Sequence, residues 1–137
     1  MENVISREQA AVEFDRWAFE IKRIKERLIN DNPDALENRE AVIKNIMDGT
    51  FTIDEEGKIT HKLCVPISDD VKELVYKPRM QVFEMSKMKE FKPEDSTGKT
   101  IAIMSVLTNL NKGIVQKLDT VDFTTVGELM SFYLLGG

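Results

Sequence analysis

The sequence predicts an α+β fold that is mainly helical, with a small antiparallel β-hairpin sheet at about residues 51–77. An N-terminal helical pair and a set of C-terminal helices flank this sheet. The prediction has two grounds: apolar residues recur every three or four positions on both sides of the segment, and they alternate with polar residues inside it. A sheet this small needs helices packed against it to be stable.

The N-terminal extension, residues 1–49, is predicted to form two antiparallel helices. Ser6 followed by Gln9 is typical of a capping box at a helix start. The apolar residues after it have helical spacing and form one face: Phe14, Trp17, Ala18, Ile21, Ile24 and Leu28. Asn32 and Pro33 suit the cap and the first position of the second helix.

Residues 50–137 are predicted to form a domain of strands followed by helices, in one compact unit with the extension. Phe51 and Ile53 alternate with threonines, which indicates a first strand. The next strand follows an acidic turn and places four residues on one face: Ile59, His61, Leu63 and Val65. A third strand at residues 71–77 ends at Pro78, which has no N–H to donate to a ladder.

Helical spacing returns after the sheet. A helix is predicted from Gln81, and a longer one over residues 101–110 with Gly113 as its left-handed cap. A short helix follows at residues 114–118. Asp119 or Thr120 is expected to cap a last helix, whose apolar residues are these: Phe123, Val126, Leu129, Met130, Phe132 and Tyr133.

Composition excludes several classes of function. A chain of 137 residues with a net charge of −5 has the size of one domain and lacks the basic patch that binds nucleic acid or an anionic membrane. Its single cysteine excludes an internal disulfide. It has no apolar run of about 20 residues and no signal-peptide pattern, so we expect a cytoplasmic protein.

One motif is similar to a nucleotide-binding loop. Residues 97–100 (Thr-Gly-Lys-Thr) match the end of a phosphate-binding loop, but Pro93 stands where that loop needs a glycine. We therefore interpret the segment as a helix start capped by Ser96 or Thr97. No cofactor is expected.

The residues that bind metals or perform catalysis are scarce. His61 is the only histidine, which excludes a histidine-pair metal site. Cys64 lies three residues later and therefore, on a strand, on the opposite face. Both are interpreted as structural, with His61 half-buried and Cys64 acting as a small hydrophobe. The sequence thus predicts neither a metal site nor an enzyme.

Two sets of apolar residues are candidates for binding a partner. The first surrounds a methionine cluster, whose adaptable side chains suit either a core or a groove for partner helices: Met80, Val82, Phe83, Met85 and Met88. The second is the last helix, because its apolar surface is too broad for one side of a helix. Part of that surface is expected to face a partner or a second copy of the chain.

An ordered set of segments in the second half resembles a known family. It begins with the hairpin of residues 60–66 and 71–77, then Pro78 and the acidic–apolar pair Glu84 and Met85. The apolar helix at residues 101–110 follows, and then residues 114–119 and 121–123. Over residues 58–135 this order is similar to the tail assembly chaperones of long-tailed bacteriophages, in particular the small-protein group of Mu-like and related contractile-tailed viruses.

The resemblance implies a binding protein without catalytic activity. Such a chaperone holds the long, apolar tape-measure protein in solution in the host cytoplasm and helps recruit tail tube subunits. An alternative is a small cytosolic adaptor or regulator that uses the apolar face of its first helix, formed by Phe14, Trp17, Ile21, Ile24 and Leu28.

Overall fold

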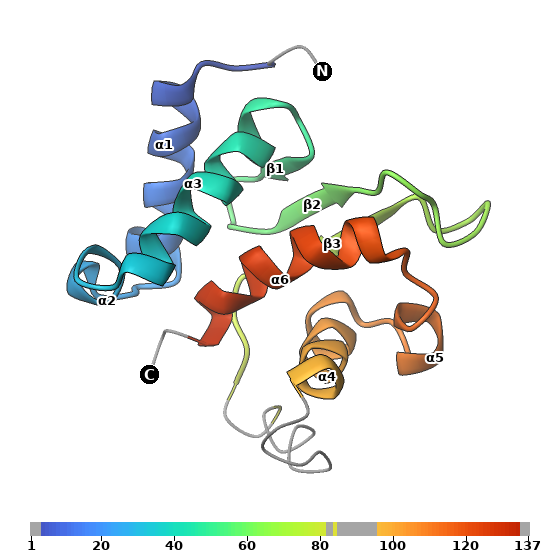
Figure 1. Ribbon diagram of the computed structural model, residues 1–137. Coiled ribbons are helices and arrows are strands. Elements are labelled where there is room, and N and C mark those ends of the chain that lie inside the picture. The colour runs from blue at the N-terminus through green and yellow to red at the C-terminus, as the bar shows by residue number, and fades with distance from the viewer. Residues whose placement is uncertain (1–3, 82–83, 85–95, 135–137) are drawn as a thin grey trace.

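The computed structural model describes residues 4–81, 84 and 96–134 (Figure 1). The elements follow one another in this order: α1 (Arg7–Asp15), the π-helix η1 (Arg16–Ile21), α2 (Glu26–Asn30), α3 (Pro33–Met47), β1 (Phe51–Ile53), β2 (Ile59–Lys62), β3 (Glu73–Tyr76), α4 (Ser96–Thr108), α5 (Lys112–Val115) and α6 (Thr120–Leu134). The predicted α+β class, mainly helical around a small antiparallel sheet, is confirmed.

The sheet has the strand order β1-β2-β3, and both pairings are antiparallel. Phe51 lies opposite His61, and Ile59 lies opposite Tyr76. These residues belong to the face that packs against the helices, and all four are buried. The other face carries exposed side chains such as Val75, so it is open in the described structure.

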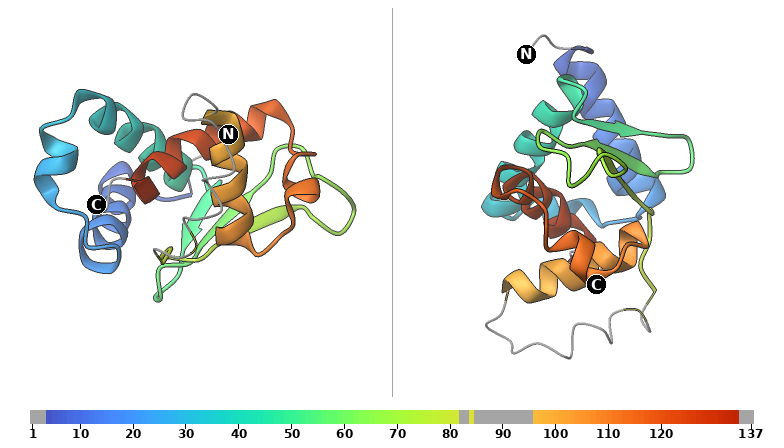
Figure 2. Two further views of the ribbon diagram at one scale, coloured as in Figure 1. Left: turned by 90° about the horizontal axis from the view of Figure 1, so that it is seen from below. Right: turned by 90° about the vertical axis from the view of Figure 1, so that its right-hand side faces the viewer.

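Helix α6 runs along the helical face of the sheet, with α1 and α3 toward one end of it and α4 and α5 toward the other (Figures 1 and 2). The extension packs on α6 through aromatic rings. The ring centroids of Phe14 and Phe132 are 5.0 Å apart, and those of Trp17 and Tyr133 are 5.5 Å apart. One hydrophobic core therefore contains residues of both the extension and the C-terminal helices.

The caps predicted for three helices are confirmed. The Ser6 hydroxyl accepts from the N–H of Gln9 at 3.1 Å, and Asn32 Oδ1 accepts from the N–H of Asp34 at 3.0 Å. Asp119 Oδ1 accepts a hydrogen bond from the backbone N–H of Val121, the second residue of α6, at 3.0 Å. Each side chain satisfies an N–H that has no partner within its own helix.

The single long first helix predicted to reach Leu28 is wrong. The helix widens into a π-turn, in which the N–H of Lys22 donates to the carbonyl of Trp17, and Arg23 then takes the left-handed conformation at φ +59°. A straight helix would rise 1.5 Å per residue away from the core. The break instead turns the chain back, so that Ile24 is buried.

The ends of the later elements also differ from the prediction. Asn109, not Gly113, is the left-handed residue after α4, with φ +60°; asparagine tolerates this conformation because its short side chain can hydrogen-bond locally. Gly113 lies inside α5, which begins two residues earlier than predicted. Helix α4 begins at Ser96, so Ser96 and Thr97 belong to its first turn and are not its cap. The helix predicted from Gln81 lies mostly outside the described residues.

Candidate functional site

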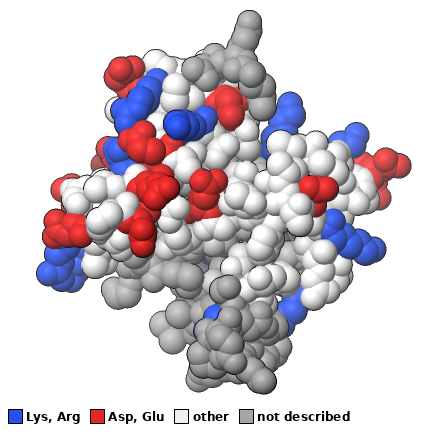
Figure 3. All heavy atoms as spheres, viewed as in Figure 1, with Lys and Arg blue, Asp and Glu red and all other residues white. Residues whose placement is uncertain are grey.

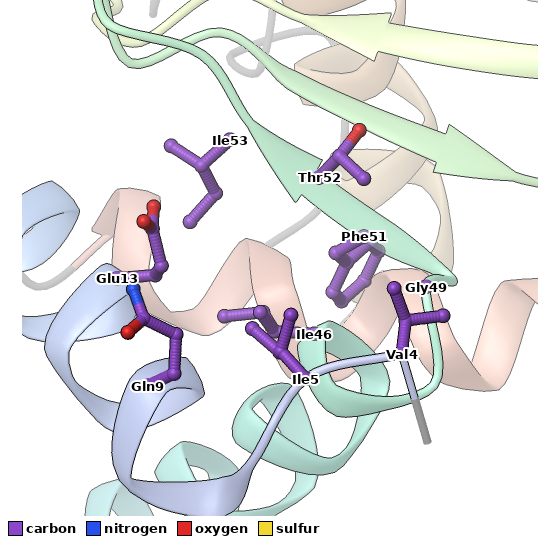
Figure 4. A pocket seen from close by; sticks show the side chains of 9 residues that line it. All are labelled: Val4, Ile5, Gln9, Glu13, Ile46, Gly49, Phe51, Thr52 and Ile53. Atoms are coloured by element: carbon purple, nitrogen blue, oxygen red, sulfur yellow. The ribbon is translucent and has the colours of Figure 1, made fainter. Parts of the chain in front are cut away.

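An apolar groove with a volume of about 200 Å³ lies between the segment of Val4 and Ile5 and strand β1 (Figure 4). The described residues that line it come from the N-terminal segment, α1, the end of α3 and β1: Val4, Ile5, Gln9, Glu13, Ile46, Gly49, Phe51, Thr52 and Ile53. Most of these side chains are aliphatic or aromatic, and the two polar ones of α1 stand on one side. The groove therefore suits apolar side chains more than a charged ligand.

Backbone contacts hold the two walls of the groove together. The N–H groups of Val4 and Ile5 both donate to the carbonyl of Met47, the last residue of α3, at 2.6 and 3.3 Å. Gly49 then turns the chain into β1 with φ +85°, and a Cβ at this position would lie 3.2 Å from Val4 Cγ2. Glycine is favoured here because other residues seldom adopt this φ.

The groove runs beside a strand edge that no other described strand pairs with. β1 is an outer strand of the sheet, and its ladder with β2 includes bonds from Lys62 N–H to the Thr50 carbonyl at 2.8 Å and from Asp54 N–H to the Lys58 carbonyl at 3.0 Å. Hydrogen-bonded pairs alternate along an antiparallel ladder. The N–H and carbonyl groups of Phe51 and Ile53 consequently point away from β2.

Charged side chains surround one end of the groove. Glu13 pairs with Arg16 at 3.1 Å, and Arg16 also donates to the carbonyl of Asp54. The turn after β1 adds the exposed carboxylates of Glu55 and Glu56. On the face shown in Figure 3, acidic and basic side chains are interspersed over the N-terminal helices.

The structure places most of the predicted partner-binding residues of α6 in the core. Five of them are buried against the sheet and the N-terminal helices: Val126, Leu129, Met130, Phe132 and Tyr133. These five side chains expose little surface, because the N-terminal extension packs on the side of α6 that the sheet leaves uncovered. Phe123 is half-buried.

The methionine cluster is described in part. Met80 is half-buried and lines a hollow of about 490 Å³ with Lys77, Arg79, Gln81 and Glu84. Lys77 and Glu84 form an ion pair across it. The other predicted members lie outside the described residues: Val82, Phe83, Met85 and Met88.

A buried polar network connects the sheet to the start of α6. His61 Nδ1 lies 2.9 Å from the Tyr76 hydroxyl, and Asp122 accepts from the backbone N–H groups of Cys64 and Val65 at 2.9 and 3.0 Å. His61 Nε2 and Asp122 Oδ1 are 4.0 Å apart, too far for a hydrogen bond. Asp122 thereby anchors the loop after β2 to α6.

Burial keeps the histidine of this network uncharged. Burial lowers the pKa of His61 to about 4, although the charge of Asp122 acts in the opposite direction. The imidazole is therefore neutral at pH 7, and none of its surface is exposed. The predicted half-burial of His61 is corrected to full burial. Cys64 is exposed and does not pack as a small hydrophobe, and local desolvation and Asp122 raise the pKa of its thiol.

Sequence analysis missed Lys22. Its Nζ lies 4.2 Å from the centroid of the Tyr133 ring and 3.4 Å from the carbonyl oxygen of Pro78. Burial, assisted by the charge of Arg79, lowers the pKa of this ammonium to about 8. These neighbours are more than fifty positions away along the chain, so no local pattern indicates the contact.

Within the described ranges, no group of three or more histidine, cysteine, aspartate and glutamate side chains is arranged to hold a metal ion. No helix there combines the length and the apolar character that crossing a bilayer requires. The chain matches no family model, no curated protein and no solved structure.

Proposed function

We propose that this protein binds an apolar segment of a partner polypeptide, and that it acts as a tail assembly chaperone of a long-tailed bacteriophage. Its principal partner would be the tape-measure protein, which it keeps soluble in the host cytoplasm while it helps recruit tail tube subunits. The proposal gives the chain a binding role and no catalytic one.

The observation that carries the binding role is the groove beside β1. It combines aliphatic and aromatic walls with a strand edge that stays unpaired within the described part of the chain, and neither His61 nor Cys64 lines it. Apolar grooves with few polar groups serve recognition of side chains.

The order of the elements supports the assignment to tail assembly. The β2–β3 hairpin is followed by Pro78 and then by α4, α5 and α6, the order on which the resemblance to the chaperone family rests. The groove itself belongs largely to the extension, which the resemblance does not cover.

A second candidate function, a protein–protein adaptor, is favoured by that location of the groove. The surface first expected for an adaptor is not available, because Phe14, Trp17 and Ile24 are buried in the core. An adaptor would instead use the groove, and its partner would be unrelated to phage tails.

Co-expression tests the chaperone proposal. We expect the candidate tape-measure protein to be insoluble alone, and soluble and co-purified when it is expressed with this chain. Ile53→Glu places a charge in the groove and should abolish the effect. Val75→Glu makes the matched change on the open face of the sheet, where Val75 is 44% exposed, and should preserve it.

A tape-measure protein that stays insoluble and does not co-purify with the wild-type chain would contradict the chaperone proposal. Capture of a different partner that depends on Ile53 but not on Val75 would favour the adaptor. We also propose that the chain associates with itself, and light scattering of the purified chain measures this.

A further inference from the structure

The free edge of β1 presents backbone groups in the pattern of an incomplete sheet. Phe51 and Ile53 direct their N–H and carbonyl groups away from β2, and among the described residues these groups have no hydrogen-bond partner. They are two residues apart, which is the repeat of the groups that one strand offers to the next in an antiparallel ladder. Only an extended segment matches this spacing.

At the opposite edge of the sheet, helix α4 contacts one end of β3. Beyond the end of β3, the N–H of Lys77 donates to the carbonyl of Leu107 in α4 at 3.0 Å. The outward backbone groups of Glu73 and Val75 on β3 also have no hydrogen-bond partner among the described residues, so what distinguishes the β1 edge is the apolar groove beside it.

The groove lies where the side chains of an added strand would be placed. Val4, Ile5 and Ile46 form its apolar wall opposite β1, so every second side chain of an added strand would meet an apolar surface. Val4 is 72% exposed in the described structure, and its coverage by such a strand would remove apolar surface from water.

Charge indicates the composition of the segment. At the end of β1, the carboxylates of Glu13, Asp54, Glu55 and Glu56 outnumber the cations of Arg16 and Lys58. A segment with lysine or arginine next to its apolar residues is complementary to this excess, and an acidic segment is disfavoured.

We propose that β1 accepts a fourth strand: an extended segment of a partner polypeptide, apolar at alternate positions and flanked by basic residues, which pairs with the backbone of Phe51 and Ile53. This inference rests on the proposed binding function of the groove, and it is independent of which protein supplies the segment. It specifies strand addition, where the resemblance to tail chaperones by itself implies binding to a helical polypeptide.

Amide hydrogen exchange of the full chain, measured by NMR, tests the pairing directly. The probe is a short synthetic peptide of alternating valine and threonine with a pair of lysines at each end. With the peptide at about ten times its Kd, exchange at the Phe51 and Ile53 amides should slow about tenfold, because only the free fraction exchanges. The Thr52 amide, which already faces β2, should change little.

Matched probes and variants control for other modes of binding. The same peptide with N-methyl groups on the amides that face β1 should not bind, whereas methylation of the alternate amides should preserve binding. Ile53→Pro removes one outward N–H and leaves the ladder to β2 intact, and Ile53→Glu places a charge in the groove. Both should weaken peptide binding by at least tenfold, and Val75→Glu should not.

Three results would overturn the inference: no binding of the peptide at millimolar concentration, binding without protection at Phe51 and Ile53, or protection at these amides that rises with protein concentration when no peptide is present. The last result would identify a second copy of the chain as the occupant. Strand addition can succeed while co-expression with the tape-measure protein fails, so the experiment separates this inference from the chaperone assignment.

Discussion

The buried His61 ring predicts how stability depends on pH. The unfolded chain binds a proton on this histidine with the ordinary pKa of 6.5, whereas the folded chain binds it only near pH 4. Between these values the unfolded state holds a proton that the folded state lacks, so stability falls as the pH falls. Above pH 6.5 this contribution is fully present.

The two pKa values set the size of the effect. From pH 7 to pH 5, protonation of the unfolded chain should lower the free energy of unfolding by about 2 kcal/mol. Protonation of other groups also contributes to the pH dependence of stability, so the wild type alone does not isolate His61. The difference between wild type and His61→Gln does isolate it, because glutamine does not titrate.

Urea unfolding followed by the fluorescence of Trp17, the only tryptophan, measures both proteins. We expect the wild type to be the more stable at pH 7, and its advantage to shrink by about 2 kcal/mol at pH 5. Tyr76→Phe, which removes the partner of Nδ1 but keeps the ring buried, should retain the pH dependence. An advantage of equal size at both pH values would refute the argument that burial holds this ring neutral.

Two further substitutions test how a tight turn and a buried carboxylate contribute to stability. Gly57→Ala should cost about 2–4 kcal/mol in urea unfolding, because φ is +90° and the new Cβ would lie 2.6 Å from Ile21 Cγ2. Its control, Gly127→Ala, meets no atom within 4 Å in helix α6 and should stabilise by up to about 1 kcal/mol; equal effects of the two would contradict the account. Asp122→Ala should lower stability by about 2–4 kcal/mol through the loss of two hydrogen bonds to backbone N–H groups, and a melting temperature unchanged from wild type would show that the anchor is dispensable.

The groove shows which features of a site can be predicted from the local sequence and which cannot. The alternation of Phe51 and Ile53 with threonines predicted strand β1 correctly, because strand period is a local property. It did not predict that β1 lies at an edge, since that depends on which strands pair. The contribution of Val4 and Ile5 was also missed, because only their hydrogen bonds to Met47 bring them next to β1.

The burial of the apolar residues of α6 was missed for the same reason. Leu129 and Phe132 were correctly recognised as apolar residues on one helix, but periodicity does not say how many neighbours cover that helix. The extension covers the side of α6 that the sheet leaves open. The broad apolar surface of α6 is therefore buried by the sheet on one side and by the extension on the other.

By itself, the sequence determined the α+β class, the three strands and the caps at Ser6, Asn32 and Asp119, because periodicity and capping act between residues a few positions apart. Only the tertiary structure decided the break at Arg23, the burial of His61 and the open edge of β1. Each of these depends on contacts between segments that are distant in the chain, and their free energy exceeds the local preferences that a sequence pattern records.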